Sequence, residues 1–343
     1  MPQMQDMNTI LEQLHTPAFL VQDGIISAAN NAAIQHFVEI GAPVSDLIVT
    51  GSEEYATFNS GSLYLAIRLG GTQFPCTITQ LQEQQLFQIE ESQESKELLA
   101  LSLAAAQISM PLSELALLTG RLSDTAEKAK IQHNLHKLQR ILGNMSDAWQ
   151  YVNTSPAMVT CDLCSIMQEV LEKAATLLAE SKVTIRYSVP NHAIYSLAEP
   201  EMLRRAVYNL LSNAVKFSPP GCIIDASVTQ SGNKLYLTVS NQPNQAPLSG
   251  GSIFHRYKRS PGLENPKYGI GLGMTLVHGT ATAHGGTILV EQMQEHSVRI
   301  TMSLAIRRSQ ENNVRSPVII PDIYGGQDQA LIELSDVLPS TLI

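Results

Sequence analysis

The most regular hydrophobic pattern of the chain lies between residues 97 and 152. Mostly apolar residues recur there in alternating steps of three and four, the heptad pattern of helices that pack along a seam. The first run is Leu98, Leu101, Ala105, Ile108, Leu112, Leu115, Thr119 and Leu122. The second run is Ile131, Leu135, Leu138, Leu142, Met145, Trp149 and Val152. Ser123 and Asp124 supply a capping signal between them. The pattern predicts an antiparallel helical hairpin, and two copies should pair into a four-helix bundle.

A different pattern precedes the hairpin, because residues 8–93 alternate short apolar runs with turn signals. Asp23-Gly24 is a strong hairpin turn signal between two predicted strands. The predicted strands are 19–22, 25–29, 62–69, 72–79 and 85–90, with a short helix at 30–38. We therefore expect a small α+β module at the start of the chain.

Strands and helices are mixed again after the hairpin. The predicted strands are 158–162, 184–188, 193–197, 223–229, 234–240, 286–291 and 298–304, and the predicted helices are 165–180, 200–217 and 274–283. Such a set favours a mixed sheet with helices over one face and a cleft beside them. In the tail, one short amphipathic helix is predicted by Ala330, Leu331, Leu334 and Leu338. The tail either packs on its own domain, lacks structure or docks a partner.

The helix at 200–217 has two different faces. A buried stripe is predicted from Leu203, Val207, Leu210 and Ala214. Asn209, Asn213 and Lys216 stand at i, i+4 and i+7, so they share another face. Two amides and an amine in one column can hold a hydrated divalent cation and phosphate oxygens. Asn and Lys also occupy ordinary solvated helix faces, so the column needs further motifs to support a function.

Two motifs that follow this helix supply that support. Residues 253–260 read IFHRYKRS, and residues 268–286 read YGIGLGMTLVHGTATAHGG. Together with the helix, they resemble the ATP-binding domain of sensor histidine kinases, which belongs to a wider group with gyrase and the heat-shock chaperone ATPases. The resemblance covers residues 95–307, and it implies an α/β sandwich after a dimerisation and phosphoacceptor hairpin. The N-terminal module is similar to a PAS sensor domain, with a two-strand start, short helices and a three-strand finish.

The resemblance implies roles at the nucleotide site. Asn213 would bind Mg²⁺ bridging the phosphates of ATP, and Lys216 would meet a phosphate oxygen. Asn209 stands where the ATPase relatives have a water-activating Glu, and an amide cannot act as that base. Asn241 stands where the family has an Asp that accepts a hydrogen bond from adenine, and the turn after it lacks the family's glycines. The other nucleotide-binding positions expected are Tyr257, Arg259, Gly269, Gly271, Leu272 and Gly273.

The chain departs from its family at the phosphoacceptor. The family carries a His-Glu pair five residues before a proline, and the corresponding positions here are Ala106 and Gln107. A methyl group has no lone pair with which to attack a phosphoryl group, so no catalytic residue is expected at this position. His133 and His136 lie on the second helix and should face outward from the seam. We expect solvated surface residues there, with a role as substitute acceptors as the alternative.

Composition limits other functions. The net charge is −9 and no basic block is present, which argues against direct binding of nucleic acid. The most apolar run, 98–118, is interrupted by polar residues, so no membrane span is expected. With no signal-peptide pattern at the start, a cytoplasmic protein is expected. Cys161 and Cys164 form a CxxC without zinc partners, so reduced core cysteines are expected, with a redox role as the alternative. His15 and His36 are expected in packing or at the surface rather than as haem ligands.

The expected fold class is an α+β multidomain protein. Its parts are a PAS-like module at 1–93, a dimerising hairpin at 94–153, an ATP-binding α/β sandwich at 154–307 and a tail at 308–343. The expected function is that of a histidine-kinase-like regulator that binds ATP and Mg²⁺ without phosphorylating itself. Its partners would be a second copy and either a response regulator or an active histidine kinase. The alternatives are a kinase that phosphorylates a partner in trans and a non-enzymatic scaffold. The N-terminal module would sense a small molecule or act as a dimerising relay without a ligand.

Overall fold

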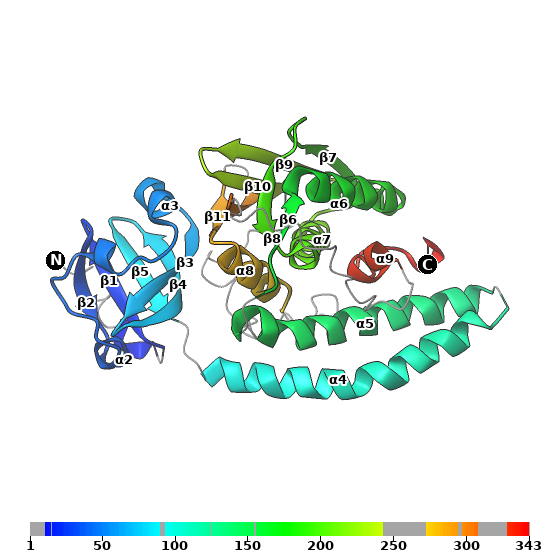
Figure 1. Ribbon diagram of the computed structural model, residues 1–343, viewed down its shortest axis with the longest axis horizontal. Coiled ribbons are helices and arrows are strands. Elements are labelled where there is room, and N and C mark those ends of the chain that lie inside the picture. Colours follow the sequence, from blue (N-terminus) through cyan, green and yellow to red (C-terminus); the bar gives the residue numbers. More distant parts are fainter. Residues whose placement is uncertain are drawn as a thin grey trace.

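The computed structural model describes residues 11–14, 16–89, 93–123, 125–153, 156–242, 272–293, 297–307 and 328–342. These residues form an N-terminal module, a long helical hairpin and a larger α/β domain (Figure 1). The C-terminal segment 328–342 packs between the hairpin and the α/β domain. The predicted α+β fold class is confirmed.

The N-terminal module is built on antiparallel strands. They are β1 (Ala18–Gln22), β2 (Ile25–Ala29), β3 (Ser62–Leu69), β4 (Thr72–Leu81) and β5 (Gln84–Ile89). Short helices α2 (Asn31–Gln35), η1 (Val44–Asp46) and α3 (Ser52–Thr57) connect β2 to β3. Asp23 and Gly24 adopt φ values of 52° and 75°, as a tight hairpin turn between β1 and β2 requires. The core includes Phe19 stacked on Phe87, with ring centroids 4.8 Å apart. The predicted two-strand start, short helices and three-strand finish are all present.

The hairpin consists of α4 (Gln93–Gly120) and α5 (Ala126–Asn153), which pack antiparallel (Figure 1). Pro111 lies inside α4 without ending it. The cap of α5 differs from the prediction, since Lys128 N–H donates to Thr125 Oγ1 at 3.2 Å. The capping residue of α5 is therefore Thr125, which follows the predicted Ser123 and Asp124. Asp124 lies outside the described residues.

Only part of the heptad seam is buried within the hairpin. The buried cluster between the helices contains Ala105, Leu112, Leu135 and Leu142. Other seam residues are exposed, with Ile108 at 50%, Leu115 at 54%, Leu122 at 52%, Ile131 at 43% and Leu138 at 48%. The hairpin alone therefore leaves an apolar stripe uncovered on both helices.

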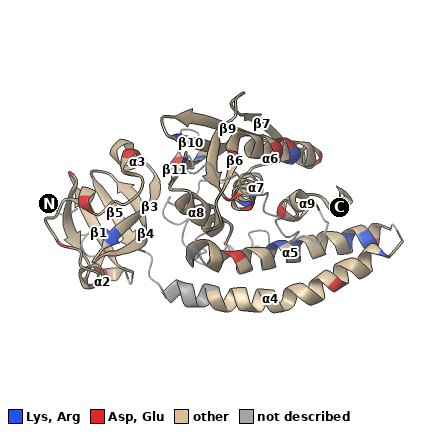
Figure 2. Ribbon diagram, viewed as in Figure 1, with Lys and Arg blue, Asp and Glu red and all other residues tan. Residues whose placement is uncertain are grey.

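The segment Leu99–Gly120 is long and apolar enough, by length and composition, to cross a membrane, with a mean hydropathy of 1.4. The expectation that no run qualifies is therefore wrong, because the scattered serines and glutamines lower the hydropathy too little. Glu114 is the only charged residue in that segment. In contrast, α5 carries Lys, Arg, Asp and Glu along much of its length (Figure 2).

The larger domain is a sheet covered by helices on one face. Its strands are β6 (Val159–Asp162), β7 (Thr184–Ser188), β8 (Tyr195–Ala198), β9 (Ile223–Ser231), β10 (Lys234–Asn241), β11 (Ile288–Gln292) and β12 (Val298–Ala305). Its helices are α6 (Leu163–Leu178), η2 (Ala179–Ser181), α7 (Pro200–Phe217) and α8 (Gly273–Ala283). Along β10, the residues Leu235, Leu237 and Val239 alternate into the core that the helices cover. One prediction is wrong: β6 and β8 pair with each other as a separate two-stranded sheet instead of joining the mixed sheet.

The sheet of the N-terminal module is continuous with the main sheet of the larger domain, which the sequence did not predict. The ten-stranded order is β2-β1-β5-β4-β3-β11-β12-β10-β9-β7, so β3 of the N-terminal module pairs antiparallel with β11 of the larger domain. Lys234 Nζ also lies 2.6 Å from Glu54 Oε2 of α3 across this junction. The ring of Tyr64 on β3 packs against His278 on α8, with centroids 4.1 Å apart. The N-terminal module is thus joined to the larger domain by backbone and side-chain contacts.

The C-terminal segment contains α9 (Gln329–Glu333) and η6 (Ser340–Leu342). Asp328 caps α9 by accepting from Ala330 N–H at 3.0 Å. The buried side chains of the segment include Ala330, Ile332, Leu334 and Leu338. The predicted short helix is present but ends at Glu333, and this part of the tail packs on its own chain.

Candidate functional site

Helix α7 presents the predicted column of polar residues. It begins at Pro200, and the Glu199 carboxylate accepts from Met202 N–H at 2.5 Å as the N-cap. The apolar face of α7 is buried through Leu203, Ala206, Val207, Leu210, Leu211 and Ala214. This buried face fixes the rotation of the helix, so Asn213 and Lys216 stand half-buried at the edge of the core.

The ammonium group of Lys216 contacts a carboxylate of the C-terminal segment. Lys216 Nζ lies 2.5 Å from Asp336 Oδ2, and Arg140 Nη1 of α5 lies 2.6 Å from the same oxygen. Burial and Arg140 lower the pKa of Lys216, while Asp336 opposes them. Burial alone would raise the pKa of Asp336, but Arg140 and Lys216 hold it below its usual value. One anionic oxygen therefore lies between two cations at the end of the polar column.

Asn209 is almost completely buried, with 1% of its surface exposed. Its Nδ2 donates to the Arg205 carbonyl at 2.9 Å, and its Oδ1 accepts from Arg140 Nη2 at 3.3 Å. Gly273 approaches it closely, because a Cβ atom at residue 273 would lie 2.6 Å from Asn209 Oδ1. Asn209 thus links α5, α7 and the start of α8, and its amide has no basic group to remove a proton from water.

Arg205 is a functional-site residue that the sequence analysis missed. Its side chain is 2% exposed. Its Nε donates to Glu333 Oε1 at 2.7 Å, and its Nη2 donates to Asn144 Oδ1 at 2.9 Å. It also forms an ion pair with Asp147. Its position four residues before Asn209 places it on the same helical face, which is the signal that could have identified it.

Charges of both signs meet between α5, α7 and the C-terminal segment. The cations are Arg140, Arg205 and Lys216, and the carboxylates are Asp147, Glu333 and Asp336. Three cations face three carboxylates, so this set is neutral in charge. Two of the carboxylates belong to the segment 328–342, and without them Asp147 alone of this set would remain to balance the three cations. The cluster would then be a strong site for an anion.

Asn241 ends β10 beside the last turn of α7 and is 8% exposed. Its Nδ2 donates to Ser218 Oγ at 3.0 Å and to the Ala214 carbonyl at 3.3 Å. With the amide nitrogen used in this way, the carbonyl oxygen is the group left to accept a hydrogen bond. That orientation fits the predicted acceptor for the exocyclic amine of adenine.

The remaining predicted nucleotide positions divide into two groups. Leu272 is described, and its side chain is buried against Ala148 and Leu276 between α5 and α8. Its side chain therefore packs the two helices together, and its role at a nucleotide stays a prediction. Tyr257, Arg259, Gly269 and Gly271 lie outside the described residues, so their roles stay predictions.

The phosphoacceptor position is exposed. Ala106 and Gln107 lie on the surface of α4 beside the buried Ala105, facing away from the seam as predicted. A methyl group and an amide are the chemistry presented there, and neither is a nucleophile for phosphorus.

His133 and His136 are buried, with 9% and 8% of their surfaces exposed, so the prediction of solvated residues is wrong. Burial lowers the pKa of both, while the negative charges of Asp336 and Asp328 in the C-terminal segment raise the pKa of His133 and His136 respectively. The reason is that the C-terminal segment covers this face of α5, which the heptad pattern alone did not indicate.

The CxxC cysteines are free thiols, with Cys161 half-buried and Cys164 buried. Burial raises the pKa of Cys161 to about 11 and also raises that of Cys164. Because the thiolate is the nucleophile and the metal ligand, both groups are held in their less reactive form. In the described part of the chain, no group of three or more His, Cys, Asp and Glu side chains is placed to bind a metal.

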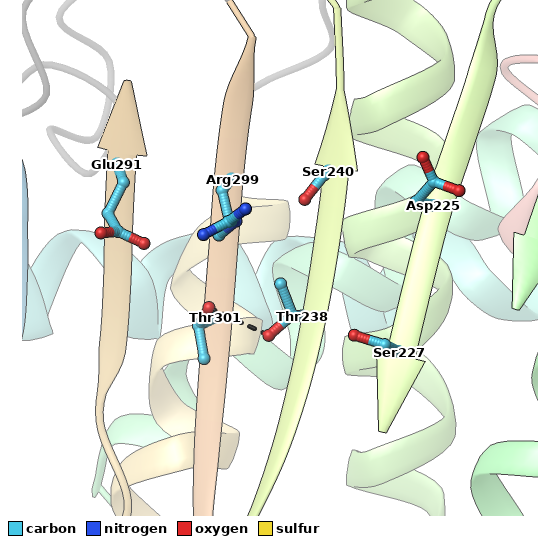
Figure 3. Close-up of a pocket in the computed structure, with 7 residues that line it drawn as sticks. All are labelled: Asp225, Ser227, Thr238, Ser240, Glu291, Arg299 and Thr301. Atoms are coloured by element: carbon cyan, nitrogen blue, oxygen red, sulfur yellow. Dashed lines mark hydrogen bonds between the residues drawn. The ribbon is translucent and has the colours of Figure 1, made fainter. Parts of the chain in front are cut away.

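A second polar feature lies on the open face of the larger domain's sheet (Figure 3). This hollow is lined by Asp225, Ser227, Thr238, Ser240, Glu291, Arg299 and Thr301. Thr238 and Ser240 alternate along β10 with the core residues Leu237 and Val239, so they face away from the helices. The hollow is therefore separate from the polar column of α7.

Comparison with known proteins identifies the domain that contains α7. Residues 198–308 match the family described as "Histidine kinase-, DNA gyrase B-, and HSP90-like ATPase". The adaptive-response sensory kinase SasA of Microcystis aeruginosa is 26% identical over 223 residues, which cover 60% of this chain and 56% of that protein. Sensor protein QseC of Escherichia coli is 26% identical over 262 residues, which cover 70% of this chain and 56% of that protein. The chain thus spans just over half the length of these two relatives.

Solved structures of histidine kinases also match. Full-length ShkA in complex with AMPPNP aligns with a TM-score of 0.48 and 17% identity, covering 61% of this chain and 46% of that chain. Histidine kinase ThkA in complex with the response regulator protein TrrA aligns with a TM-score of 0.41 and 17% identity, covering 87% of this chain and 98% of that chain.

Proposed function

We propose that this chain, which belongs to the sensor histidine kinase family through its ATP-binding domain, binds ATP with Mg²⁺ beside α7 and regulates a two-component pathway without phosphorylating itself. The observation that carries this proposal is the pair of cations, Lys216 and Arg140, that meets a single anionic oxygen at the end of α7. A phosphate oxygen is bound by the same ammonium and guanidinium donors.

The residues present fit both ends of a nucleotide. At one end, Asn241 keeps its carbonyl oxygen for an adenine amine, because its amide nitrogen donates to Ser218 and Ala214. At the other end, the column of α7 ends in Lys216. Asn213, one turn before it, supplies the amide oxygen that Mg²⁺ accepts alongside waters and phosphate oxygens. Mg²⁺ there would screen the negative charge of the phosphates.

The regulatory role without self-phosphorylation is supported by the surface of α4. A kinase of this family needs a nucleophile held in line with the γ-phosphate. At the position that the family resemblance assigns to it, the exposed side chain is Ala106, followed by Gln107. ATP would then serve as a ligand that stabilises one arrangement of the hairpin and the ATP-binding domain.

A homodimer through the hairpin is supported by the part of the heptad seam that the hairpin leaves exposed. The exposed seam residues lie on both helices, at Ile108, Leu115 and Leu122 of α4 and at Ile131 and Leu138 of α5. A second copy would cover this stripe as a four-helix bundle. Insertion of the whole hairpin into a membrane is disfavoured by the charged residues of α5, and a cytoplasmic location is proposed on this ground.

The partner that we propose is a response regulator or an active histidine kinase. The histidine kinase ThkA has been crystallised in complex with the response regulator protein TrrA. For this chain the proposed docking element is the dimeric hairpin, whose arrangement would change with the occupancy of the nucleotide site.

Calorimetric titration of the full chain with Mg-ATP tests the nucleotide proposal. Asn213→Ala should weaken binding by about 1–3 kcal/mol, because the metal loses a ligand close to charged groups. Asn233→Ala is the matched control, since Asn233 is exposed in the turn between β9 and β10. Wild-type protein that binds no nucleotide at millimolar concentration would refute the proposal.

A further inference from the structure

The C-terminal segment places two carboxylates against the buried cations of α5 and α7. Asp336 accepts from Lys216 and Arg140 through one oxygen, and Glu333 accepts from Arg205 at 2.7 Å. Glu333 is fully buried, and 21% of the Asp336 side chain is exposed. These contacts join residues more than a hundred positions apart in the chain, and no local requirement of α9 explains them.

The chemistry of the Asp336 contact is that of a phosphate subsite. Its Oδ2 atom receives an ammonium at 2.5 Å and a guanidinium nitrogen at 2.6 Å. Charge-assisted contacts of this kind are the strong ones, and they serve carboxylate and phosphate oxygens alike. A terminal phosphate bound by Lys216 would need the space and the charge that Asp336 now uses.

The contact surface between α5 and the segment also differs from a permanent core. Among the described residues, the buried polar atoms without a hydrogen-bond partner include His133 Nδ1, His136 Nδ1 and Gln139 Oε1 on α5, and Ser335 Oγ in the segment. Each such atom carries a desolvation cost, because it gives up its hydrogen bonds to water without gaining a replacement partner. Apolar anchors such as Ile332 and Leu334 oppose this cost. Release of the segment from α5 would therefore expose these polar atoms to water, where they would gain hydrogen bonds.

We propose that the segment 328–342 is an internal acidic ligand of the phosphate subsite formed by Lys216 and Arg140, and that Asp336 leaves this subsite when Mg-ATP binds. This inference rests on the proposed function, since it assumes that the phosphates of ATP approach Lys216. It adds Arg140, a residue of the helical hairpin, to the groups that contact nucleotide. The subsite therefore contains one cation from each domain, and a phosphate that replaces Asp336 would bridge the hairpin to the ATP-binding domain.

The competition can be measured with the full-length chain and Mg-ATP. Asp336→Asn removes the competing charge, so Mg-ATP should bind about tenfold more tightly, because the fraction of open sites rises. Asp328→Asn is the matched control, since Asp328 pairs with Lys173 where both side chains are at least a third exposed. In the Asp336→Asn background, Arg140→Gln should weaken binding about tenfold if the guanidinium holds a phosphate oxygen.

Hydrogen exchange of the wild-type chain gives a second test that needs no variant. Mg-ATP should speed exchange of the backbone amides of residues 328–342 and leave those of β9 and β10 unchanged. Equal affinities for wild type and Asp336→Asn, together with unchanged exchange in the nucleotide-bound protein, would overturn the inference and leave ATP binding intact. Folded wild-type and Asp336→Asn proteins that both fail to bind Mg-ATP would overturn the proposed function, and the competition with it.

Discussion

Arg205 on α7 and Glu333 on α9 form an ion pair in which both side chains are almost wholly buried, with Arg205 Nε 2.7 Å from Glu333 Oε1. The pair connects the helix of the polar column to the C-terminal segment. Because removing two charges from water is costly, such a pair adds little to stability compared with a pair of apolar side chains. Loss of one partner is destabilising, because it leaves the other charge buried and unpaired.

We expect Arg205→Met to lower the free energy of unfolding by about 3–5 kcal/mol, because Glu333 and Asp147 each lose a buried partner. Chemical denaturation monitored by circular dichroism measures this change. The control is Arg186→Met, whose pair with Asp225 has side chains 62% and 55% exposed. It should leave the free energy of unfolding nearly unchanged, because water screens an exposed ion pair. Equal losses for the two variants would contradict the role of burial.

The junction between the two sheets gives a second prediction. Gly61 precedes β3 with φ at 81°, and a Cβ atom there would collide with the Val290 carbonyl of β11. Gly61→Ala should therefore separate β3 from β11 while both modules stay folded. Hydrogen exchange should then increase at the amides of residues 288–290.

Gly24→Ala is the matched control for this substitution. Gly24 has a φ of 75°, and a Cβ atom there would meet nothing within 4 Å. It should share the backbone strain of about 1–2 kcal/mol without the collision. If both variants change the hydrogen exchange of residues 288–290 equally, backbone strain causes the change and the collision at the sheet junction does not.

The sequence predicted elements better than it predicted the contacts between them. The predicted strands 62–69 and 184–188 and the helix 200–217 are found with the predicted bounds, because each carries its own period and its own boundary signals. The pairing of β3 with β11 is made by backbone hydrogen bonds. Because many different side chains are compatible with such bonds, no pattern of residues indicates this pairing. The network of Arg140, Asn209 and Asp336 was missed because its members are far apart in the chain.

His284 gives a pH prediction with a defined geometry. It is 3% exposed, its Nδ1 lies 2.7 Å from the Thr280 carbonyl and its Nε2 accepts from Glu199 N–H at 3.0 Å. Burial lowers its pKa below 6.5. A lowered pKa contributes stability that is present above pH 6.5 and lost as the pH falls, since the unfolded chain binds the proton first.

The melting temperature of wild type should therefore fall more between pH 7.5 and pH 5.5 than that of His284→Gln. The amide oxygen of Gln can accept from Glu199 N–H without titrating. Acid-sensitive groups elsewhere, including His133 and His136, are common to both proteins and cancel in the difference. Parallel pH profiles would show that His284 does not contribute.

The exposed part of the heptad seam predicts the oligomeric state. Ile108→Glu combined with Leu115→Glu should give monomers in light scattering with unchanged helical content, since both side chains are at least 50% exposed in one chain. Leu112→Glu provides the comparison, because Leu112 is 5% exposed against α5 and its loss should destabilise the hairpin itself. A monomeric wild type at micromolar concentration would remove the basis of the homodimer.

The final prediction concerns phosphorylation, and it starts from the two surfaces of the hairpin. Ala106 is exposed on α4 and offers no lone pair. His133 and His136 on α5 have imidazole nitrogens, but both rings are buried where the C-terminal segment packs, at 9% and 8% exposure. Neither surface therefore presents an accessible nucleophile to a γ-phosphate.

Purified wild-type protein should take up no acid-labile label from γ-labelled ATP, because transfer needs an acceptor in line with the phosphate. Ala106→His combined with Gln107→Glu supplies a nucleophile and a carboxylate to orient it, and this variant should gain label. Adding a response regulator to the wild type tests the alternative of a kinase that acts in trans. Such a kinase would transfer label to the response regulator and not to itself. The wild type could instead take up label that is lost in His133→Gln or His136→Gln. That result would mean that the C-terminal segment leaves α5 and exposes a histidine acceptor there.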